Sequence, residues 1–105
     1  MHNLHMNISR FRKSRGLSQR DMAEMIGCDQ STIQRAESLH VSAKIKTYTE
    51  YATALEMKLH DLFAEDVTPD EIEILRMFRR APASKHDEIM AILRLAREET
   101  DAEAQ

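Results

Sequence analysis

The side chains best suited to specific hydrogen bonding lie close together in the sequence, between residues 30 and 35. They comprise two amides, two hydroxyls and one guanidinium, namely Gln30, Ser31, Thr32, Gln34 and Arg35. Amide and guanidinium groups form bidentate hydrogen bonds with purine edges in the major groove of DNA, and hydroxyls bond to several base edges. Thr32 also carries a methyl group that suits contact with a thymine methyl. On one face of a helix, these residues would read base pairs.

The residues around this polar group predict two short helices that cross at a tight turn. Gly27 lies where the first helix, residues 19–26, must end, because glycine tolerates the positive φ that such a turn needs. Ala23 is small enough for a close crossing. The apolar residues expected on the inside are Met22, Ile26, Cys28, Ile33 and Ala36. The second helix, residues 29–39, then turns its polar side chains outward. An ordinary pair of packed helices is the alternative.

Composition indicates a small helical protein rather than an enzyme or a membrane protein. The chain has 105 residues, of which 42% are hydrophobic and 31% charged, with two glycines and two prolines. One cysteine excludes an internal disulfide and a cysteine-based zinc site. No apolar run is long enough for a membrane span, so we expect a cytoplasmic protein. No nucleophile with a nearby base and no glycine-rich phosphate loop occurs, so we expect neither catalysis nor a cofactor.

The charge of −3 is distributed unevenly along the chain. Residues 1–63 contain nine Lys and Arg against seven Asp and Glu, a balance of +2. Residues 64–105 contain six against eleven, a balance of −5. A mildly basic N-terminal part is compatible with a DNA partner, provided that base contacts contribute strongly to the affinity.

Helical spacing predicts five helices in a first domain, residues 1–66. The first runs from about residue 4 to 15 and stops at Gly16. Ser18 and Asp29 are the expected N-caps of the next two, and Asp29 should accept a bond from a backbone amide of residue 31 or 32. The fourth begins at Ser42 or Lys44. The inward-facing residues of the first, fourth and fifth helices are predicted to be Ile8, Phe11, Ile45, Tyr48, Ala52, Leu55, Leu59, Leu62 and Phe63.

Two further helices are predicted in residues 67–99, where they form a helical hairpin. Residues 68–71, Thr-Pro-Asp-Glu, are a capping box with proline at the first helical position, and that helix should end near Arg80. Ser84 opens the last helix, with Asp87 as its acidic partner, and the helix should end at about Glu99. An acidic tail, residues 100–105, is expected to be flexible.

The hairpin is more apolar than a helix pair lying on a monomer needs to be. It therefore either covers the first five helices or pairs with its copy in a second chain. We favour pairing, which makes the hairpin a dimerisation element. The residues expected to mediate it are Ile72, Leu75, Phe78, Ile89, Ile92, Leu93 and Ala96.

Motifs spread over residues 8–63 form a set that is specific as a whole. They are Ile8-x-x-Phe11-Arg12, Gly16-Leu17-Ser18-Gln19-x-x-Met22-Ala23, Ile26-Gly27-Cys28-Asp29-x-Ser31-Thr32-Ile33, Glu37, Thr47-Tyr48-x-x-Tyr51-Ala52-x-Ala54-Leu55 and Leu59-x-x-Leu62-Phe63. The set resembles the lambda-repressor/Cro-like, or XRE, helix-turn-helix DNA-binding domains. The resemblance implies an all-α, five-helix DNA-binding domain; the C-terminal helical hairpin, which keeps the whole chain all-α, lies outside it.

The resemblance also implies roles for individual residues. Gln19 is expected to contact a phosphate and to brace Gln30, the first residue of the recognition helix. Gln30 and Ser31 resemble a base-reading pair, Arg35 reaches either guanine or a phosphate, and Gln34 is a further reader. The remaining phosphate-binding candidates are Ser18, Lys44 and Lys46, and a solvated helix face is the alternative for the two lysines.

A family-typical ion pair is implied between Arg12 and Glu37, with two separately solvated charges as the alternative. Its expected role is to fix the angle of the recognition helix. The family usually has a glycine soon after this glutamate, but here the segment is Ser-Leu-His-Val-Ser, residues 38–42. Either the helix runs longer, or a non-glycine residue adopts the unusual backbone. Leu39 and Val41 then either pack inward or form a contact surface.

The function implied is that of a sequence-specific transcriptional regulator whose partner is double-stranded DNA. A symmetric homodimer would place two recognition helices in successive major grooves about 34 Å apart, on a pseudo-palindromic operator. Repression would follow from occlusion of a promoter. The alternative is an antitoxin-type protein whose hairpin binds a partner protein, with DNA binding for autoregulation.

Histidine and cysteine provide only weak signals. His2 and His5 are three residues apart, and the other three histidines are scattered, so no metal site is expected. Cys28 occupies a turn position and should behave as a small hydrophobic residue, with a redox-sensing thiol as the alternative.

Overall fold

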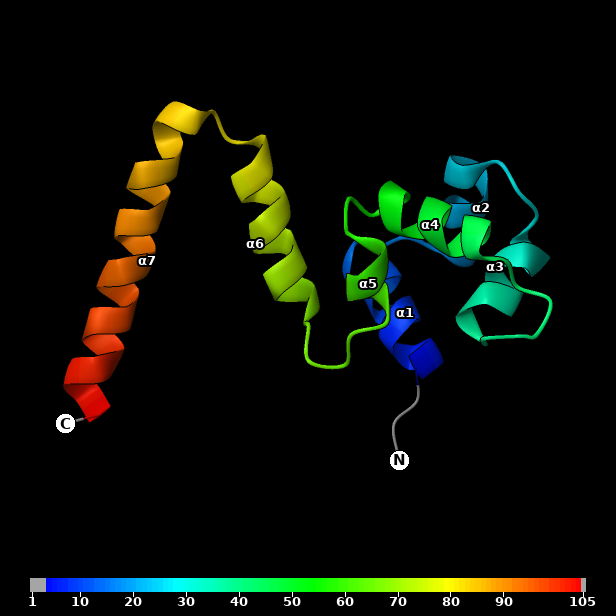
Figure 1. The fold of residues 1–105 in the computed structure, drawn as a ribbon, viewed down its shortest axis with the longest axis horizontal. Helices are drawn as coiled ribbons and strands as arrows, with labels where there is room; N and C mark the ends of the chain where they lie inside the picture. Colours follow the sequence, from blue (N-terminus) through cyan, green and yellow to red (C-terminus); the bar gives the residue numbers. More distant parts are fainter. Residues whose placement is uncertain (1–3, 105) are drawn as a thin grey trace. The chain divides into compact units, whose positions relative to one another are not determined.

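The computed structural model describes the backbone of residues 4–104 and the side chains of residues 8–97. That part of the chain is helical, without strands, which confirms the expected all-α class. The chain divides into two compact units, Met1–Ile72 and Glu73–Gln105. The helices labelled in Figure 1 are α1 (Leu4–Ser14), α2 (Gln19–Ile26), α3 (Gln30–Glu37), α4 (Ile45–Ala54), α5 (Leu59–Leu62), α6 (Pro69–Arg80) and α7 (Ala83–Ala104).

Capping explains where α2 and α6 begin. The backbone amide of Ser18 donates to Asp21 Oδ2 at 2.8 Å, and the amide of Asp21 donates to Ser18 Oγ at 2.9 Å. Thr68 and Glu71 form the same reciprocal pair at 3.1 and 3.2 Å. Each pair satisfies two amides that have no partner within the helix. The capping box predicted at residues 68–71 is therefore confirmed.

The start of α3 differs from the prediction, and its end follows the second of the two predicted alternatives, a non-glycine residue in the unusual backbone. Asp29 occupies the N-cap position but makes no side-chain capping bond, so the expected bond to residue 31 or 32 is wrong. α3 ends at Glu37 rather than running on, and Leu39 adopts φ +57°. The amide of His40 donates to the carbonyl of Arg35, and the amide of Leu39 to that of Ala36. This is a Schellman ending, with leucine in the left-handed position that usually holds glycine.

The core of the first unit lies between α1, α2, α3, α4 and α5. Its buried apolar residues are Ile8, Phe11, Met22, Ala23, Ile33, Ala36, Tyr48, Tyr51, Ala52, Leu55, Met57, Leu62 and Ile72. Tyr48 and Phe63 meet edge to face with ring centroids 5.1 Å apart. Ile45 is 70% exposed, so its predicted inward position is wrong. Ile72 is only 7% exposed within this core, which removes it from the expected dimerisation surface.

The second unit contains the remainder of α6, followed by α7. α7 begins at Ala83, so Ser84 lies inside the helix rather than at its cap, and the helix continues beyond the expected end to Ala104. The side chains of the acidic tail, residues 100–105, lie outside those that the structure describes. No helix in the described part of the chain is long and apolar enough to cross a membrane.

The elbow between α6 and α7 is held by a histidine. The His86 ring stacks on Phe78 with centroids 4.0 Å apart. His86 Nε2 lies 2.9 Å from the carbonyl oxygen of Phe78 and 3.1 Å from that of Ala81. Because both partners are acceptors, Nε2 carries the proton and donates to them. These bonds satisfy two carbonyls near the end of α6 and fix the start of α7 against it.

Candidate nucleic-acid interface

The outward face of α3 carries the predicted base-reading residues together. Ile33, Ala36 and Glu37 are buried and define the inner side of the helix. The side chains on the opposite side are exposed, and these are Gln30, Ser31, Gln34 and Arg35. Thr32 is half-buried at the edge between the two sides. The helix therefore presents amides, one hydroxyl and one guanidinium in a contiguous strip.

One contact on this face orients Arg35. Its Nη2 donates to Thr32 Oγ1 at 3.3 Å, one turn earlier on α3. Four of the five guanidinium N–H groups remain for other acceptors. Thr32 Oγ1 accepts this bond, so its hydroxyl hydrogen is still free to donate, and its methyl group is available to a thymine.

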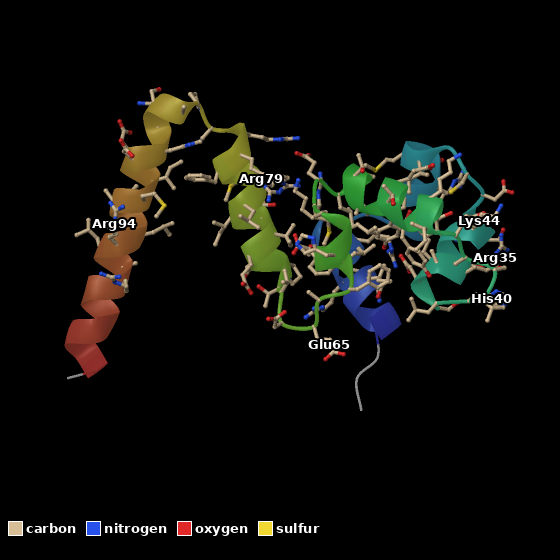
Figure 2. The ribbon with its side chains drawn as sticks, viewed as in Figure 1. Arg35, His40, Lys44, Glu65, Arg79 and Arg94 are labelled. Atoms are coloured by element: carbon tan, nitrogen blue, oxygen red, sulfur yellow. The ribbon has the colours of Figure 1, made fainter. Side chains whose placement is uncertain are left out.

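A hollow beside α3 gathers positive charge. Arg35, Lys44 and Lys46 line it, together with Gly27, Cys28, Thr32, Ser42, Ala43, Thr47 and Glu50. Figure 2 shows Arg35, His40 and Lys44 at one end of the first unit, with Glu65 at the other. The single carboxylate of the hollow, Glu50, lies 3.8 Å from Lys46 Nζ. Three cations against one carboxylate give this side of α3 the charge that a phosphate backbone needs.

A buried carboxylate fixes α3 against the rest of the first unit. Arg12 Nε donates to Glu37 Oε2 at 2.7 Å, and Arg12 Nη2 donates to Glu37 Oε1 at 3.1 Å. Both residues are buried. Arg12 Nη1 also donates to the carbonyl of Leu17 at 2.8 Å. The ion pair implied by the resemblance is therefore present, in the bidentate geometry that gives both strength and orientation.

Two further donors complete the hydrogen bonding of the Glu37 carboxylate. Tyr51 Oη lies 2.6 Å from Glu37 Oε2, and Gln19 Nε2 lies 3.0 Å from Glu37 Oε1. Gln19 thus bonds to Glu37 rather than bracing Gln30 as expected. Sequence reasoning gave Tyr51 no specific role. Its phenol was the available signal, because a buried tyrosine hydroxyl requires a hydrogen-bond partner.

The ionisation of this cluster follows from the bonds. Burial alone would raise the pKa of Glu37, but hydrogen bonds from Arg12, Gln19 and Tyr51 outweigh it and leave the pKa below its usual range. The bond to Glu37 raises the pKa of Arg12. Burial, and then the bond to Glu37, raises the pKa of Tyr51 well above its usual value. The cluster therefore holds one anion, one cation and a neutral phenol at neutral pH.

The start of α2 is a less favourable anion site than the sequence suggested. Ser18 Oγ already accepts the amide of Asp21, so only its hydroxyl hydrogen is left for a phosphate. The Asp21 carboxylate takes the Ser18 amide, and this backbone bond lowers the pKa of Asp21. A fixed negative charge therefore stands where a phosphate would bind. Gln19 retains the second hydrogen of its amide nitrogen for such a contact.

The loop after α3 is exposed next to the basic hollow. Val41 is 98% exposed and Leu39 is 38% exposed, so neither packs inward. His40 Nδ1 lies 2.8 Å from Ser42 Oγ and accepts the amide of Ser42 at 3.1 Å. This local bonding shapes the loop so that Val41 projects at its tip.

Neither metal nor thiol chemistry is evident at this interface. Among the described residues, no three His, Cys, Asp or Glu side chains are grouped to hold a metal ion. The side chains of His2 and His5 lie outside the described residues. Cys28 is half-buried against the core, and this burial raises the pKa of its thiol. A thiol so shifted is less ionised at neutral pH and therefore less reactive.

Comparison with known proteins places the first unit in a protein family. A protein-family profile described as helix-turn-helix matches residues 8–62. That segment is more than half of the chain, and it includes the crossing of α2 and α3, the Arg12–Glu37 pair and the basic hollow. No curated protein and no solved structure matches the chain.

Proposed function

Because the chain belongs to the lambda-repressor/Cro-like helix-turn-helix family of DNA-binding transcriptional regulators, we propose that it is a sequence-specific repressor. It binds a pseudo-palindromic operator as a homodimer, with α3 in the major groove. The observation that supports this most strongly is the exposed polar strip of α3 on a helix whose opposite side is fixed by a buried ion pair. A recognition helix needs both features, because base discrimination depends on side chains that are held in a constant position.

The base contacts are assigned to the exposed strip. Gln30 and Gln34 suit adenine, which offers an acceptor and a donor to an amide. Arg35 suits the two acceptors of guanine, and its bond to Thr32 aligns it before DNA arrives. Ser31 bonds to several edges, and the Thr32 methyl lies at the margin of the strip for a thymine.

The phosphate contacts are assigned to the two sides of α3. Lys44 and Lys46 flank the hollow on one side, and Lys44 is also the N-cap of α4, where unpaired backbone amides favour an anion. Ser18 and Gln19 lie on the other side, at the start of α2. Because Asp21 opposes an anion there, the lysine side carries more of the phosphate affinity.

Repression follows from occlusion of a promoter that overlaps the operator. Two copies related by a two-fold axis place their α3 helices in successive major grooves, about 34 Å apart. The first unit is only mildly basic, so non-specific affinity is weak and occupancy depends on the correct base sequence.

The test is selection of bound fragments from a random DNA pool at about physiological salt. The wild type should enrich a two-fold symmetric motif, and Gln30→Ala/Arg35→Ala should lose it. Lys58→Ala is the matched control, because it removes one exposed cation of the first unit away from α3 and should leave the motif intact. Identical pools from the wild type and the α3 variant would refute the base-reading assignment.

A second candidate is an antitoxin-type protein whose hairpin covers a partner protein. It is supported by the apolar side chains that α6 and α7 leave exposed, among them Ile74, Met77 and Leu95. The two candidates differ in the state of the isolated protein. A stable dimer with no exposed apolar patch supports the repressor, whereas a monomer that aggregates or binds a hydrophobic dye supports the antitoxin.

A further inference from the structure

Two tyrosines of α4 are bonded to the C-terminal end of α3. Tyr48 Oη donates to the carbonyl oxygen of Ala36 at 2.9 Å, and Tyr51 Oη donates to Glu37 Oε2 at 2.6 Å. Both tyrosines are buried. Ala36 and Glu37 are the last two residues of α3. One phenol therefore holds the backbone of α3, and the other holds its buried carboxylate.

Both phenol rings are enclosed by the rest of the first unit. Tyr48 meets the ring of Phe63 edge to face, an arrangement that aromatic pairs favour. The carbonyl oxygen of Ile8, on α1, lies 3.4 Å from Tyr51 Oη. Because side chains in a packed core keep one rotamer, each hydroxyl offers α3 a hydrogen bond at a constant position.

The same helix carries the lysines that we assign to the DNA backbone. Lys44 is the N-cap of α4, and Lys46 is the second residue of that helix. The segment from Lys44 to Tyr51 spans about two helical turns. α4 thus joins, within one short helical segment, cations suited to phosphate and hydroxyls that bind the end of α3.

We propose that Tyr48 and Tyr51 are positioning residues for base recognition, through which α4 sets the angle of α3 relative to the DNA backbone. A change in this angle moves the exposed side chains of α3 relative to the base edges, and hydrogen bonds weaken steeply when they are misaligned. The buried tyrosines therefore affect the discrimination between base pairs without contacting DNA. This inference rests on the proposed DNA-binding function and assigns two further residues to it.

The experiment removes one oxygen atom at a time from the full chain, with Tyr48→Phe, Tyr51→Phe and the double variant. No acceptor is left without a hydrogen bond, because the carbonyl of Ala36 also accepts a backbone amide and Glu37 Oε2 also accepts Arg12 Nε. Each variant should therefore fold, although less stably than the wild type. Circular dichroism and urea unfolding check this.

The measurement is the specificity ratio, which is the Kd for an operator with one altered base pair divided by the Kd for the operator itself. The operator is the motif that the wild type selects from the random pool. One altered base pair typically weakens binding about 5- to 150-fold. Each single variant should lower the ratio about twofold, and the double variant about fivefold or more. Residues without ligand contact alter such coupling by about 2- to 30-fold.

Two comparisons separate positioning from loss of stability. A variant that is only less stable has fewer folded molecules, so it weakens binding to both DNAs equally and leaves the ratio unchanged. Ile72→Val is the matched control, because it shortens a buried side chain on α6 rather than on α3 or α4. Adding both tyrosine changes to Gln30→Ala/Arg35→Ala should leave the remaining DNA affinity within about twofold, because the tyrosines act through these readers.

The outcomes separate the inference from the function on which it rests. A wild type that selects a motif while all three variants keep its specificity ratio would overturn the positioning role and leave the base-reading assignment intact. An equal fall of the ratio in Ile72→Val would overturn the positioning role as well. A wild type that selects no motif would refute the proposed function and this inference together.

Discussion

The buried carboxylate of Glu37 allows a quantitative test of what holds α3 in place. Its two oxygens receive four hydrogen bonds, two from Arg12 and one each from Gln19 and Tyr51. We consider Arg12→Met, Glu37→Met and the double variant, because methionine fills most of the space of either side chain without a charge. Each single change leaves one buried charge without its partner, and this should cost about 3–5 kcal/mol.

The double variant should cost much less than the sum of the two single variants. Removing both charges leaves none stranded, and replacing a buried pair by apolar side chains is often nearly neutral. Tyr51 and Gln19 lose their acceptor, although the carbonyl of Ile8 lies 3.4 Å from Tyr51 Oη and can replace it. We expect a net cost of about 2 kcal/mol or less. The interaction free energy of the cycle is then at least about 4 kcal/mol.

The assay is urea unfolding at pH 7, followed by tyrosine fluorescence. The chain has two tyrosines and no tryptophan, and both tyrosines are buried in the first unit, so the signal reports that unit. A single variant that costs less than about 1 kcal/mol would show that the pair behaves like a solvated surface pair. Additive single and double variants would refute the reasoning that the two charges stabilise each other.

Three further predictions concern the same unit. Because the pKa of Glu37 is lowered in the folded protein, its carboxylate stabilises the fold above the pKa of the unfolded chain. The free energy of unfolding, measured by urea titration, should therefore fall as the pH drops below about 4.3. The fall should be less steep for Arg12→Met/Glu37→Met, which lacks this carboxylate. Tyr51→Phe removes a bond to a buried anion and should cost about 1.5–3 kcal/mol in the same assay; a smaller loss than about 0.5 kcal/mol would contradict this bond's importance. Leu39→Gly should raise the unfolding free energy by about 0.5–1 kcal/mol, because glycine relieves the left-handed backbone at the end of α3. A lower melting temperature for Leu39→Gly would show instead that the leucine side chain stabilises the loop.

Much of the first unit was predictable because its constraints are local. Gly27 has φ +87° at the end of α2, and Ala23 is buried at the crossing with α3, as the spacing of small and apolar residues predicted. The capping box at residues 68–71 placed the start of α6 at Pro69. In each case one residue type satisfies a backbone requirement that few others satisfy, and such requirements are readable without tertiary information.

The predictions that differed depended on what lies beyond the local segment. Ile45 has the helical spacing of a core residue, but it is the first residue of α4, and its side chain projects past the end of the core. Ile72 follows a strong helix-start signal, yet the first turn of α6 packs on the first unit. Tyr51 fits an apolar pattern, and only the structure shows that its hydroxyl reaches the Glu37 carboxylate.

The Glu37 cluster has a consequence for how specificity is distributed in the proposed repressor. The carboxylate on α3 is bonded to Arg12 on α1, Gln19 on α2 and Tyr51 on α4, so four helices share one buried charge. A rotation of α3 that moved its polar strip relative to the groove would break several of these bonds at once. A misplaced α3 therefore loses free energy through broken hydrogen bonds inside the protein, even before contacts with DNA are considered.

Residues that never touch a base should consequently influence which bases are preferred. Gln19 is the most exposed member of the cluster and stands at the start of α2, where the proposal places a phosphate contact. A phosphate held by the second amide hydrogen of Gln19 would lie one side chain away from the anion that positions α3. Binding of the DNA phosphate backbone and base recognition would then be coupled. A shift of the phosphate contact would move Gln19 and so change its hydrogen bond to Glu37, which helps to set the angle of α3. Specificity in this protein is thus expected to depend on Arg12 and Tyr51 as well as on Gln30 and Arg35.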